Sequence, residues 1–242
     1  MSQALTICKK ELKVYFESPI AYIFIIAFLI ISGFIFFRGF FLFGEASMRG
    51  FFVLIPWLCL FFIPAVTMRL WAEERKVGTN ELLFSLPVME WQVVIGKYLA
   101  ALFVYTLTLL LTFPLAITVA VLANPPWKIE WGVVFASYFG AFLLGSSILS
   151  LGTYVSALTR NQIVAFILGV IIVSALMVVG EPIVTLFLPA GLVPTAEYLG
   201  LVRHFASLAR GVIDTRDIIY YLLLTTLPLY FTVKQIKGSK VG

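Results

Sequence analysis

The sequence predicts an all-α integral membrane protein, because its composition and its long apolar runs both exceed what soluble domains carry. Of its 242 residues, 62% are hydrophobic and only 12% are charged, whereas soluble domains are roughly 45–50% apolar. A helix that crosses a bilayer needs about 20 mostly apolar residues, since each backbone polar group must be satisfied within the segment. Six runs meet this criterion: residues 20–37, 51–68, 98–123, 132–158, 163–180 and 218–233. Their length and lack of alternation exclude the strands of an outer-membrane barrel.

The segment before the first run, residues 3–16, has the pattern of an amphipathic helix. Four side chains recur on one helical face: Leu5, Cys8, Leu12 and Tyr15. Three basic side chains lie off that face: Lys9, Lys10 and Lys13. We expect a helix in the cytoplasmic interface, with its apolar face in lipid and its lysines near anionic headgroups. The alternative is a frayed basic tail, which the regular periodicity disfavours.

The first run, residues 20–37, is interpreted as a retained helix rather than a secretory signal. Glu11 and Glu17 dilute the basic segment before it, and no small-residue cleavage site follows before Arg38. The run is also longer than the apolar core of a normal signal peptide.

The distribution of Lys and Arg predicts the orientation, because cytoplasmic connections are richer in these residues. With the N-terminus inside, the inner connections hold eleven Lys and Arg and the outer ones hold six. Both termini are therefore expected in the cytoplasm, as is the connection between the second and third runs. The net charge of +5 follows from the same rule, and we infer no nucleic-acid partner from it. Cys8 lies beside the inner surface and Cys59 within the second run, so we expect no disulfide between them in that reducing environment.

The third and fourth runs carry signals for shape and packing. Pro114 predicts a kink in the third. The fourth places Ser137, Ala141 and Gly145 at four-residue spacing, and small residues allow helices in lipid to approach closely. Close packing within one bundle is the favoured interpretation, while a serine-lined substrate path and a subunit contact stay open.

Within the longest outer segment, residues 181–215, we expect residues 182–210 to form two short helices that dip back into the membrane as a lid. Pro189, Gly191 and Pro194 separate the two helices, and Gly211 ends the second. Four residues are candidates for an outer gate: Arg203, His204, Phe205 and Arg210. For His204 a hydrogen-bonded structural role is favoured over a gating role.

The stretch RLWAEERKVGTNELLFSLPV, residues 69–88, concentrates charge directly after the second run. We expect residues 69–76 to continue that run as a solvated helix, which Gly78 ends. Thr79 is a suitable N-cap for a second helix over residues 79–86, with Glu81 in its first turn. That helix is followed by Pro87 and carries exposed apolar residues: Leu82, Leu83, Phe84 and Leu86. Exposed apolar side chains in so short a helix indicate a docking partner, and a solvated hairpin is the alternative.

Several other functions are disfavoured by what the sequence lacks. Ile95-Gly96-Lys97 is not a phosphate-binding loop, since Trp91 and Tyr98 stand where Gly and Ser or Thr are required. Any ATP is therefore expected to bind a separate subunit, and this chain is expected to hold no cofactor or metal. The middle of each apolar run is uncharged, unlike ion-coupled carriers. A passive channel would show a stripe of Asn, Gln or charged residues along several runs. Only the Ser and Thr residues of the fourth run come near this pattern.

An intramembrane protease is a further alternative, suggested by the paired Glu73 and Glu74. Such chemistry needs additional histidines to activate water. The chain has one histidine, His204, which is predicted on the opposite side of the membrane.

The run EERKVGTNELLFSLPV, followed by VVIGKYLAAL, closely resembles the permease subunits of ABC-2 type transporters. Six spans, an N-terminal interface helix and a short coupling helix after the second span recur in that family. Four further stretches resemble the gliding-motility-type permeases of the GldF kind: SPIAY, PWLCLFFIPAVTMRLWAEE, TRNQIVAFILGV and HFASLARGVIDTRDIIYY.

The resemblance implies an exporter subunit in a bacterial inner membrane that pairs with a second permease chain. It implies two copies of a cytoplasmic ATPase that bind ATP and Mg, and it is compatible with an accessory membrane protein. The coupling region would comprise Glu73, Glu74, Arg75, Gly78, Thr79, Glu81 and Leu82, with Leu83 and Leu86 on the apolar side of the docking helix. Mechanical work without transported cargo, a scaffold role and a passive channel are the alternatives.

Overall fold

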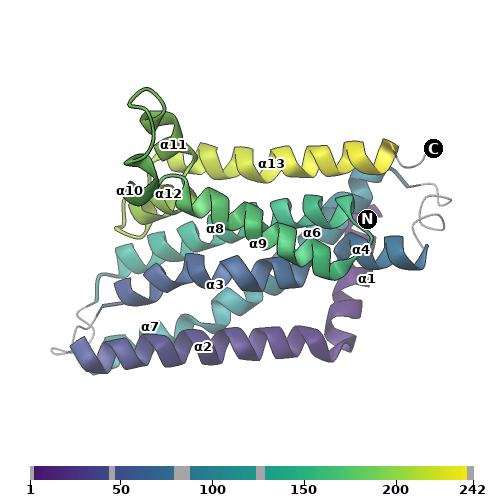
Figure 1. Ribbon diagram of the computed structural model, residues 1–242. Coiled ribbons are helices and arrows are strands. Elements are labelled where there is room, and N and C mark those ends of the chain that lie inside the picture. Colours follow the sequence, from purple (N-terminus) through teal and green to yellow (C-terminus); the bar gives the residue numbers. More distant parts are fainter. Residues whose placement is uncertain (1–2, 44–46, 79–87, 124–128, 239–242) are drawn as a thin grey trace.

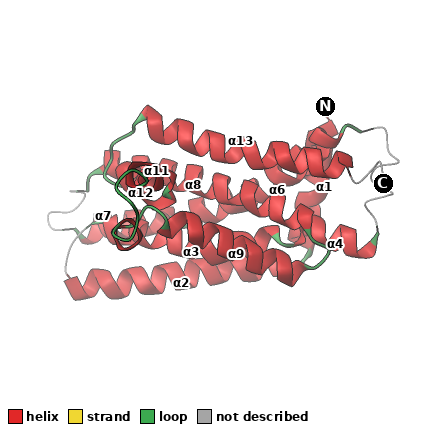
Figure 2. Ribbon diagram, turned by 45° about the horizontal axis from the view of Figure 1, so that its top comes forward, coloured by secondary structure: helices red, strands yellow, loops and turns green. Residues whose placement is uncertain are grey.

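The computed structural model describes residues 3–43, 47–78, 88–123 and 129–238, and within these ranges each regular element is a helix. Six helical segments run along the molecule (Figure 1): α2 (Pro19–Phe43), α3 (Arg49–Thr67), α6 (Glu90–Leu111) continued by α7 (Phe113–Leu122), α8 (Trp131–Leu158), α9 (Gln162–Val178) and α13 (Thr215–Gly238). At one end lie α1 (Gln3–Glu17) and α4 (Arg69–Val77). At the other end lie α10 (Pro182–Thr185), α11 (Val193–Leu199) and α12 (Leu201–Leu208), and Figure 2 also shows α11 and α12 there.

Length and hydropathy support a multi-pass membrane protein. In the described part of the chain, four helical stretches are long and apolar enough to cross a bilayer: Ala21–Leu42, Arg49–Val77, Glu90–Leu122 and Trp131–Leu158. The apolar helix Gln162–Val178 is shorter, and α13 runs beside α8 with charged residues near both of its ends. The count of six spans stays a prediction.

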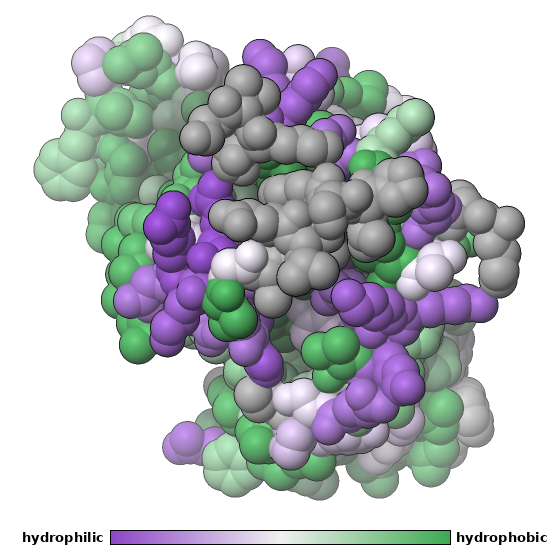
Figure 3. Space-filling view, turned by 90° about the vertical axis from the view of Figure 1, so that its right-hand side faces the viewer, coloured by the Kyte–Doolittle hydropathy of each residue, from purple (hydrophilic) through white to green (hydrophobic). Residues whose placement is uncertain are grey.

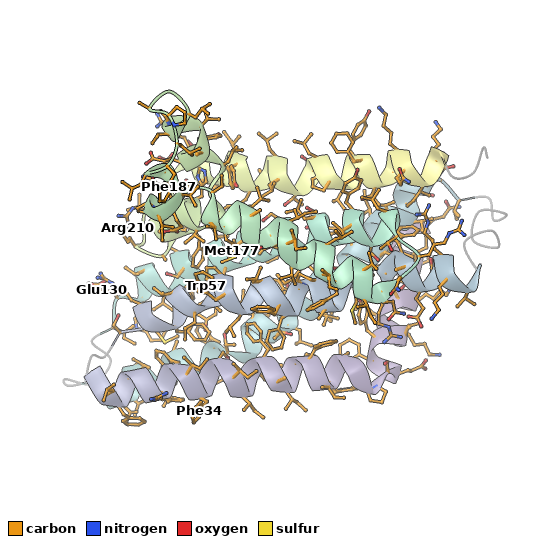
Figure 4. All side chains as sticks on the ribbon, in the orientation of Figure 1. Phe34, Trp57, Glu130, Met177, Phe187 and Arg210 are labelled. Carbon is orange, nitrogen blue, oxygen red and sulfur yellow. The ribbon has the colours of Figure 1, made fainter. Side chains whose placement is uncertain are left out.

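Burial distinguishes a central helix from a peripheral one. Of an 18-residue apolar stretch in each helix, 67% is buried inside the molecule in α8 and 22% in α2. Phe34 on α2 points away from the bundle (Figure 4) and is 68% exposed. The centre of the fold is therefore α8, and most of the surface of α2 is not covered by the described part of the bundle.

The predicted kink in the third run is confirmed. The helix breaks at Thr112, and Pro114 lies in the first turn of α7, where its missing N–H costs no hydrogen bond. The Thr112 hydroxyl donates to the carbonyl of Leu109 at 2.6 Å. This bond satisfies one of the carbonyls that the break releases.

Small residues of α8 make room for side chains of other elements. A Cβ on Gly145 would lie 2.1 Å from the Tyr105 ring, and a Cβ on Gly152 would lie 2.1 Å from Thr67 Oγ1. The Ser150 hydroxyl lies 2.9 Å from the carbonyl of Leu224 on α13. These contacts agree with the interpretation favoured for the small residues of α8, which is close packing within one bundle.

The outer segment differs from the expectation of two helices. It forms three, because the chain bends at Gly200 between α11 and α12. Pro194 lies in the first turn of α11 and does not separate helices, since its fixed φ suits a helix start. A Cβ on Gly180 or on Gly200 would lie 2.9 Å from the other residue's Cα, so the bend packs directly against the end of α9.

The end of the last short helix follows the sequence expectation more closely. Gly211 has φ +87, a backbone conformation that glycine adopts readily. The N–H of Val212 donates to the carbonyl of Ser207 at 3.2 Å. This wrapping of the chain is typical of a glycine-terminated helix.

The packing of Tyr105 over Gly145 predicts that Gly145→Ala lowers the free energy of unfolding by about 1–3 kcal/mol, the usual cost of overpacking. The buried ring has little freedom to shift, since its hydroxyl donates to the carbonyl of Ala141 at 2.7 Å. Chemical unfolding of the protein in detergent micelles measures the change. Gly33→Ala is the control, because no atom lies within 4 Å of a Cβ there. Equal stabilities for the two variants would contradict this packing.

Candidate functional site

A buried lysine connects three helices at the α1 and α4 end of the bundle. The Lys97 side chain, on α6, is 2% exposed. Its Nζ lies 2.7 Å from Glu74 Oε1 on α4 and 3.0 Å from Glu11 Oε1 on α1. The same ammonium lies 5.1 Å from the centroid of the Trp71 ring. We call Glu11, Trp71, Glu74 and Lys97 the Lys97 junction.

The close approach of α1 and α6 depends on Gly96, the residue before this lysine. A Cβ on Gly96 would lie 2.8 Å from Ile7 Cγ2 and 2.9 Å from the carbonyl oxygen of Ala4. The absence of a side chain there allows the two helices to touch. Glu11, one turn farther along α1 than Ile7, thereby comes within reach of Lys97.

This packing corrects the orientation expected for α1. Cys8 and Tyr15 belong to the face that was expected in lipid, but Cys8 is buried and Tyr15 donates to the carbonyl of Val66 at 3.1 Å. Burial and the Glu11 carboxylate raise the pKa of the Cys8 thiol, so the thiol stays protonated at neutral pH. Leu5 is 47% exposed. The helix is present, but about half of its apolar face packs on protein.

The base of α4 is held by α8. Ser156 Oγ accepts the backbone N–H of Trp71 at 3.1 Å and of Ala72 at 3.2 Å, and it donates to the carbonyl of Met68 at 3.0 Å. Met68 is the residue at which α3 ends and α4 begins. One serine side chain therefore satisfies the backbone groups that this break exposes.

The far part of α4 makes another contact with α8. The Arg75 guanidinium donates to the carbonyl of Ala157. On the same helix Arg69 pairs with Glu73 at 2.9 Å.

The coupling residues predicted from the sequence divide into two groups. Glu73, Glu74 and Arg75 lie on α4, and Gly78 ends it with φ +78. The predicted docking helix over residues 79–86 lies outside the described residues, together with Thr79, Glu81, Leu82, Leu83 and Leu86. The expectation that residues 69–76 form a solvated helix is wrong for Glu74, because it pairs with a lysine that is itself buried. Figure 3 shows hydrophilic residues gathered on this end of the molecule.

Lys97 was not predicted as a site residue, because its charge was taken to lie outside the third run, residues 98–123. The helix starts at Glu90 instead, so Lys97 lies two turns inside it. Its two carboxylate partners lie 23 and 86 residues away in the sequence. The lysine beside Gly96 within an apolar run was the one local signal that pointed to it.

The four outer-gate candidates lie near the opposite end of the bundle and do not form one cluster. Arg210 is exposed there (Figure 4), whereas Phe205 is buried. Arg203 pairs with Glu197 at 2.5 Å. Since α12 and α4 lie at opposite ends (Figure 1), His204 is not brought together with Glu73 and Glu74, as a protease site would require.

His204 occupies a hydrogen-bonded network between α12 and α13. Its Nδ1 lies 2.7 Å from Asp217 Oδ1, and its Nε2 lies 2.8 Å from the carbonyl oxygen of Tyr198. The Tyr220 ring stacks on the imidazole at 3.9 Å between centroids. These contacts fit the structural role favoured for this histidine.

Comparison with protein families places this geometry in context. The profile described as ABC-2 family transporter protein matches residues 6–193. The chain belongs to this family. The match includes all four residues of the Lys97 junction and all of α4, and permeases of the ABC-2 family generally work with a cytoplasmic ATPase. The narrower likeness to gliding-motility-type permeases gains no support from the match, and no curated protein matches the chain.

The Lys97 junction predicts that Lys97→Met lowers the free energy of unfolding by roughly 3–5 kcal/mol, because it leaves two carboxylates without the buried cation between them. The triple variant Glu11→Gln, Glu74→Gln, Lys97→Met is expected to recover part of that loss. Chemical unfolding in detergent micelles measures both.

Lys13→Met is the matched control for this prediction. Lys13 is a lysine of α1 whose side chain is 75% exposed and lies 3.6 Å from Glu17, and exposed pairs contribute about 0–1 kcal/mol. A Lys97→Met variant as stable as the control would show that the junction does not hold the three helices together.

Proposed function

We propose that the chain is the membrane-spanning subunit of an ABC transporter, in which a separate ATPase subunit drives transport through α4 and the segment that follows it. The observation that carries this proposal is the anchorage of α4. This short helix leads to the stretch with the expected docking residues, and it is attached to the bundle at three levels.

The three contacts connect α4 to two helices of the bundle, α8 at its start and near its end and α6 in its middle. Ser156 of α8 bonds to the start of α4, and Lys97 of α6 pairs with Glu74 in its middle. Near the end of α4, Arg75 donates a hydrogen bond to the carbonyl of Ala157 on α8. Energetic coupling between sites is carried by such chains of packed and hydrogen-bonded groups. A force applied beyond Gly78 would therefore move α4 together with α8 and α6.

In this proposal residues 79–86 form the helix that enters a groove of the ATPase. Leu82, Leu83 and Leu86 would supply its apolar contact, and Thr79 and Glu81 would stabilise its first turn. Glu73, Arg75 and Gly78 would fix how the helix leaves α4. ATP and Mg would bind to the ATPase and not to this chain.

The end that carries α4 is proposed to face the cytoplasm of a bacterium. The start of α1 and the end of α13 lie at the same end as α4 (Figure 1), and the lysines of both helices follow the positive-inside rule there. The complete transporter would contain two ATPase copies and a second permease chain, act as an exporter, and accept an accessory membrane protein. The outer segment, residues 182–210, would open and close the exit.

A passive channel is less well supported than a driven transporter. Serines of α8 have their hydroxyls bonded to carbonyls of their own helix: Ser146 to Leu143 at 2.8 Å, and Ser147 to Leu144 at 2.7 Å. Both side chains are also buried, whereas the polar groups that line a water-filled pore are accessible to water. Mechanical work by the same ATP-driven movement stays the second candidate, because the anchorage of α4 would transmit force with or without cargo.

Co-expression with the ATPase encoded beside the permease tests the docking segment. Glu81→Arg and Leu82→Asp are expected to abolish co-purification and permease-stimulated ATP turnover. Glu81→Arg reverses the charge in the first turn of the docking helix, and Leu82→Asp places a charge in its apolar contact with the ATPase. Lys237→Glu, an exposed charge reversal at the same end, is the control. Normal binding and turnover by the two docking variants, with the fold intact, would favour the solvated hairpin and a scaffold role.

The anchorage of α4 generates a second prediction. Ser156→Ala is expected to leave ATPase binding intact but to lower stimulated turnover several-fold, because it removes three hydrogen bonds at the base of α4. Ser174→Ala is the control, since that hydroxyl bonds only to Ile171 within its own helix. Turnover by Ser156→Ala equal to that of the control would mean that the base of α4 does not transmit the movement.

A further inference from the structure

A cavity of about 230 Å³ opens beside the Lys97 junction, where α1, α2, α3, α4 and α6 meet. One wall is charged and is formed by Lys10, Glu11, Arg69, Glu73, Glu74 and Lys97. The rest of the lining includes small and apolar side chains of α2, α3 and α6, among them Ala21, Phe24 and Val104. The lining of the site therefore combines charged groups with apolar side chains.

A smaller apolar cavity of about 30 Å³ continues from it. The two share Phe24, Val66 and Val104 as lining residues. Of the polar groups in the smaller cavity, the Thr108 hydroxyl donates to Val104 and the Tyr105 hydroxyl donates to Ala141. Because these hydroxyls are already bonded, the second cavity suits hydrocarbon better than water.

The length of the combined groove matches one leaflet of a membrane. Lys97 lies at its charged end and Thr108 at its apolar end, which is about 16 Å along α6 at the usual helical rise. The hydrocarbon core of a bilayer is about 30 Å thick, so one leaflet contributes about 15 Å. The groove thus has the polarity and the length of a lipid with its head at the charged wall.

The charged wall favours a head that carries both signs. It holds three basic and three acidic side chains, whereas a site for a net anionic lipid is expected to hold a basic excess. Lys97 is committed to two carboxylates, whereas Arg69 and Glu73 form a pair at 2.9 Å whose side chains stay 28% and 44% exposed, so each can also contact a lipid head. Within the described ranges Lys10 has no ion pair, and it lines the same cavity as Glu73.

We propose that this groove binds one zwitterionic glycerophospholipid, with its phosphate near Lys10 and Arg69, its ammonium near Glu73, and one acyl chain along Phe24, Val66 and Val104. The site faces inward. Ala21 and Phe28, which flank Phe24 on α2, are 4% and 2% exposed, so the lipid would lie between helices and not on the outer surface of the bundle. This proposal goes beyond ATP-driven transport and does not depend on it.

Native mass spectrometry of the purified chain tests the proposal, using phosphatidylethanolamine and phosphatidylglycerol with identical acyl chains. Wild type is expected to retain one phosphatidylethanolamine, at least about fivefold more than phosphatidylglycerol at equal concentration. This difference corresponds to about 1 kcal/mol. Equal retention of the two lipids, or preference for phosphatidylglycerol, would overturn the zwitterionic assignment.

Two substitutions separate the groove from the general lipid surface. Ala65→Trp fills the larger cavity, which Ala65 lines, and is expected to lower retention about tenfold. Val53→Trp is the control, because Val53 lies on the same helix but is 65% exposed. Should Ala65→Trp fail to fold, as judged by thermal unfolding, Val104→Phe fills the groove from α6 instead. Retention unchanged in the folded groove variant would overturn the site.

The head assignment has its own variant. Glu73→Gln removes the carboxylate assigned to the ammonium and leaves a basic excess, so it is expected to shift the preference several-fold toward phosphatidylglycerol. Lys13→Gln, a charge removal on the exposed side of α1, is the control. An unchanged preference in Glu73→Gln would overturn the contact between Glu73 and the head. None of these measurements uses the ATPase, so their failure is distinct from failure of the proposed transport function.

Discussion

The burial of the Lys97 ammonium is the constraint on which this end of the molecule depends. A buried charge is tolerated only where opposite charges and hydrogen bonds replace the lost water. Here the replacement comes from two carboxylates on two other helices, at 2.7 and 3.0 Å. The position of α6 therefore fixes the positions of α1 and α4. None of the three helices can shift by a turn without separating the ammonium from one of its partners.

The small residues of α8 extend this constraint to the rest of the bundle. Gly145 admits the ring of Tyr105 from α6, and Gly152 admits Thr67 from the end of α3. Ser156, one turn farther, holds the base of α4, and Ser150 contacts α13. Because interiors packed this closely do not deform gradually, a movement of α4 requires the central helix to move with it.

The sequence predicted features that a single element encodes. Apolar runs located the long helices, Pro114 located the kink, and Gly78 and Gly211 located two helix ends, because each signal acts within a few residues of itself. Lys97 was not predicted as a site residue, since its role depends on partners 23 and 86 residues away. For the same reason the face of α1 was assigned to lipid although Cys8 and Tyr15 pack on protein. Amphipathic periodicity shows that a face is apolar but does not distinguish lipid from a neighbouring helix.

The proposed lipid groove and α4 share residues, so the two proposals are physically connected. Glu73 and Glu74 belong to α4, while Lys10 and Glu11 belong to α1, and all four line the same cavity. A movement of α4 driven by an ATPase would change the spacing of the charged wall around a bound head. By linkage, a lipid that binds one position of α4 more tightly than another must favour that position in return. The bilayer itself would then influence how readily this permease responds to ATP.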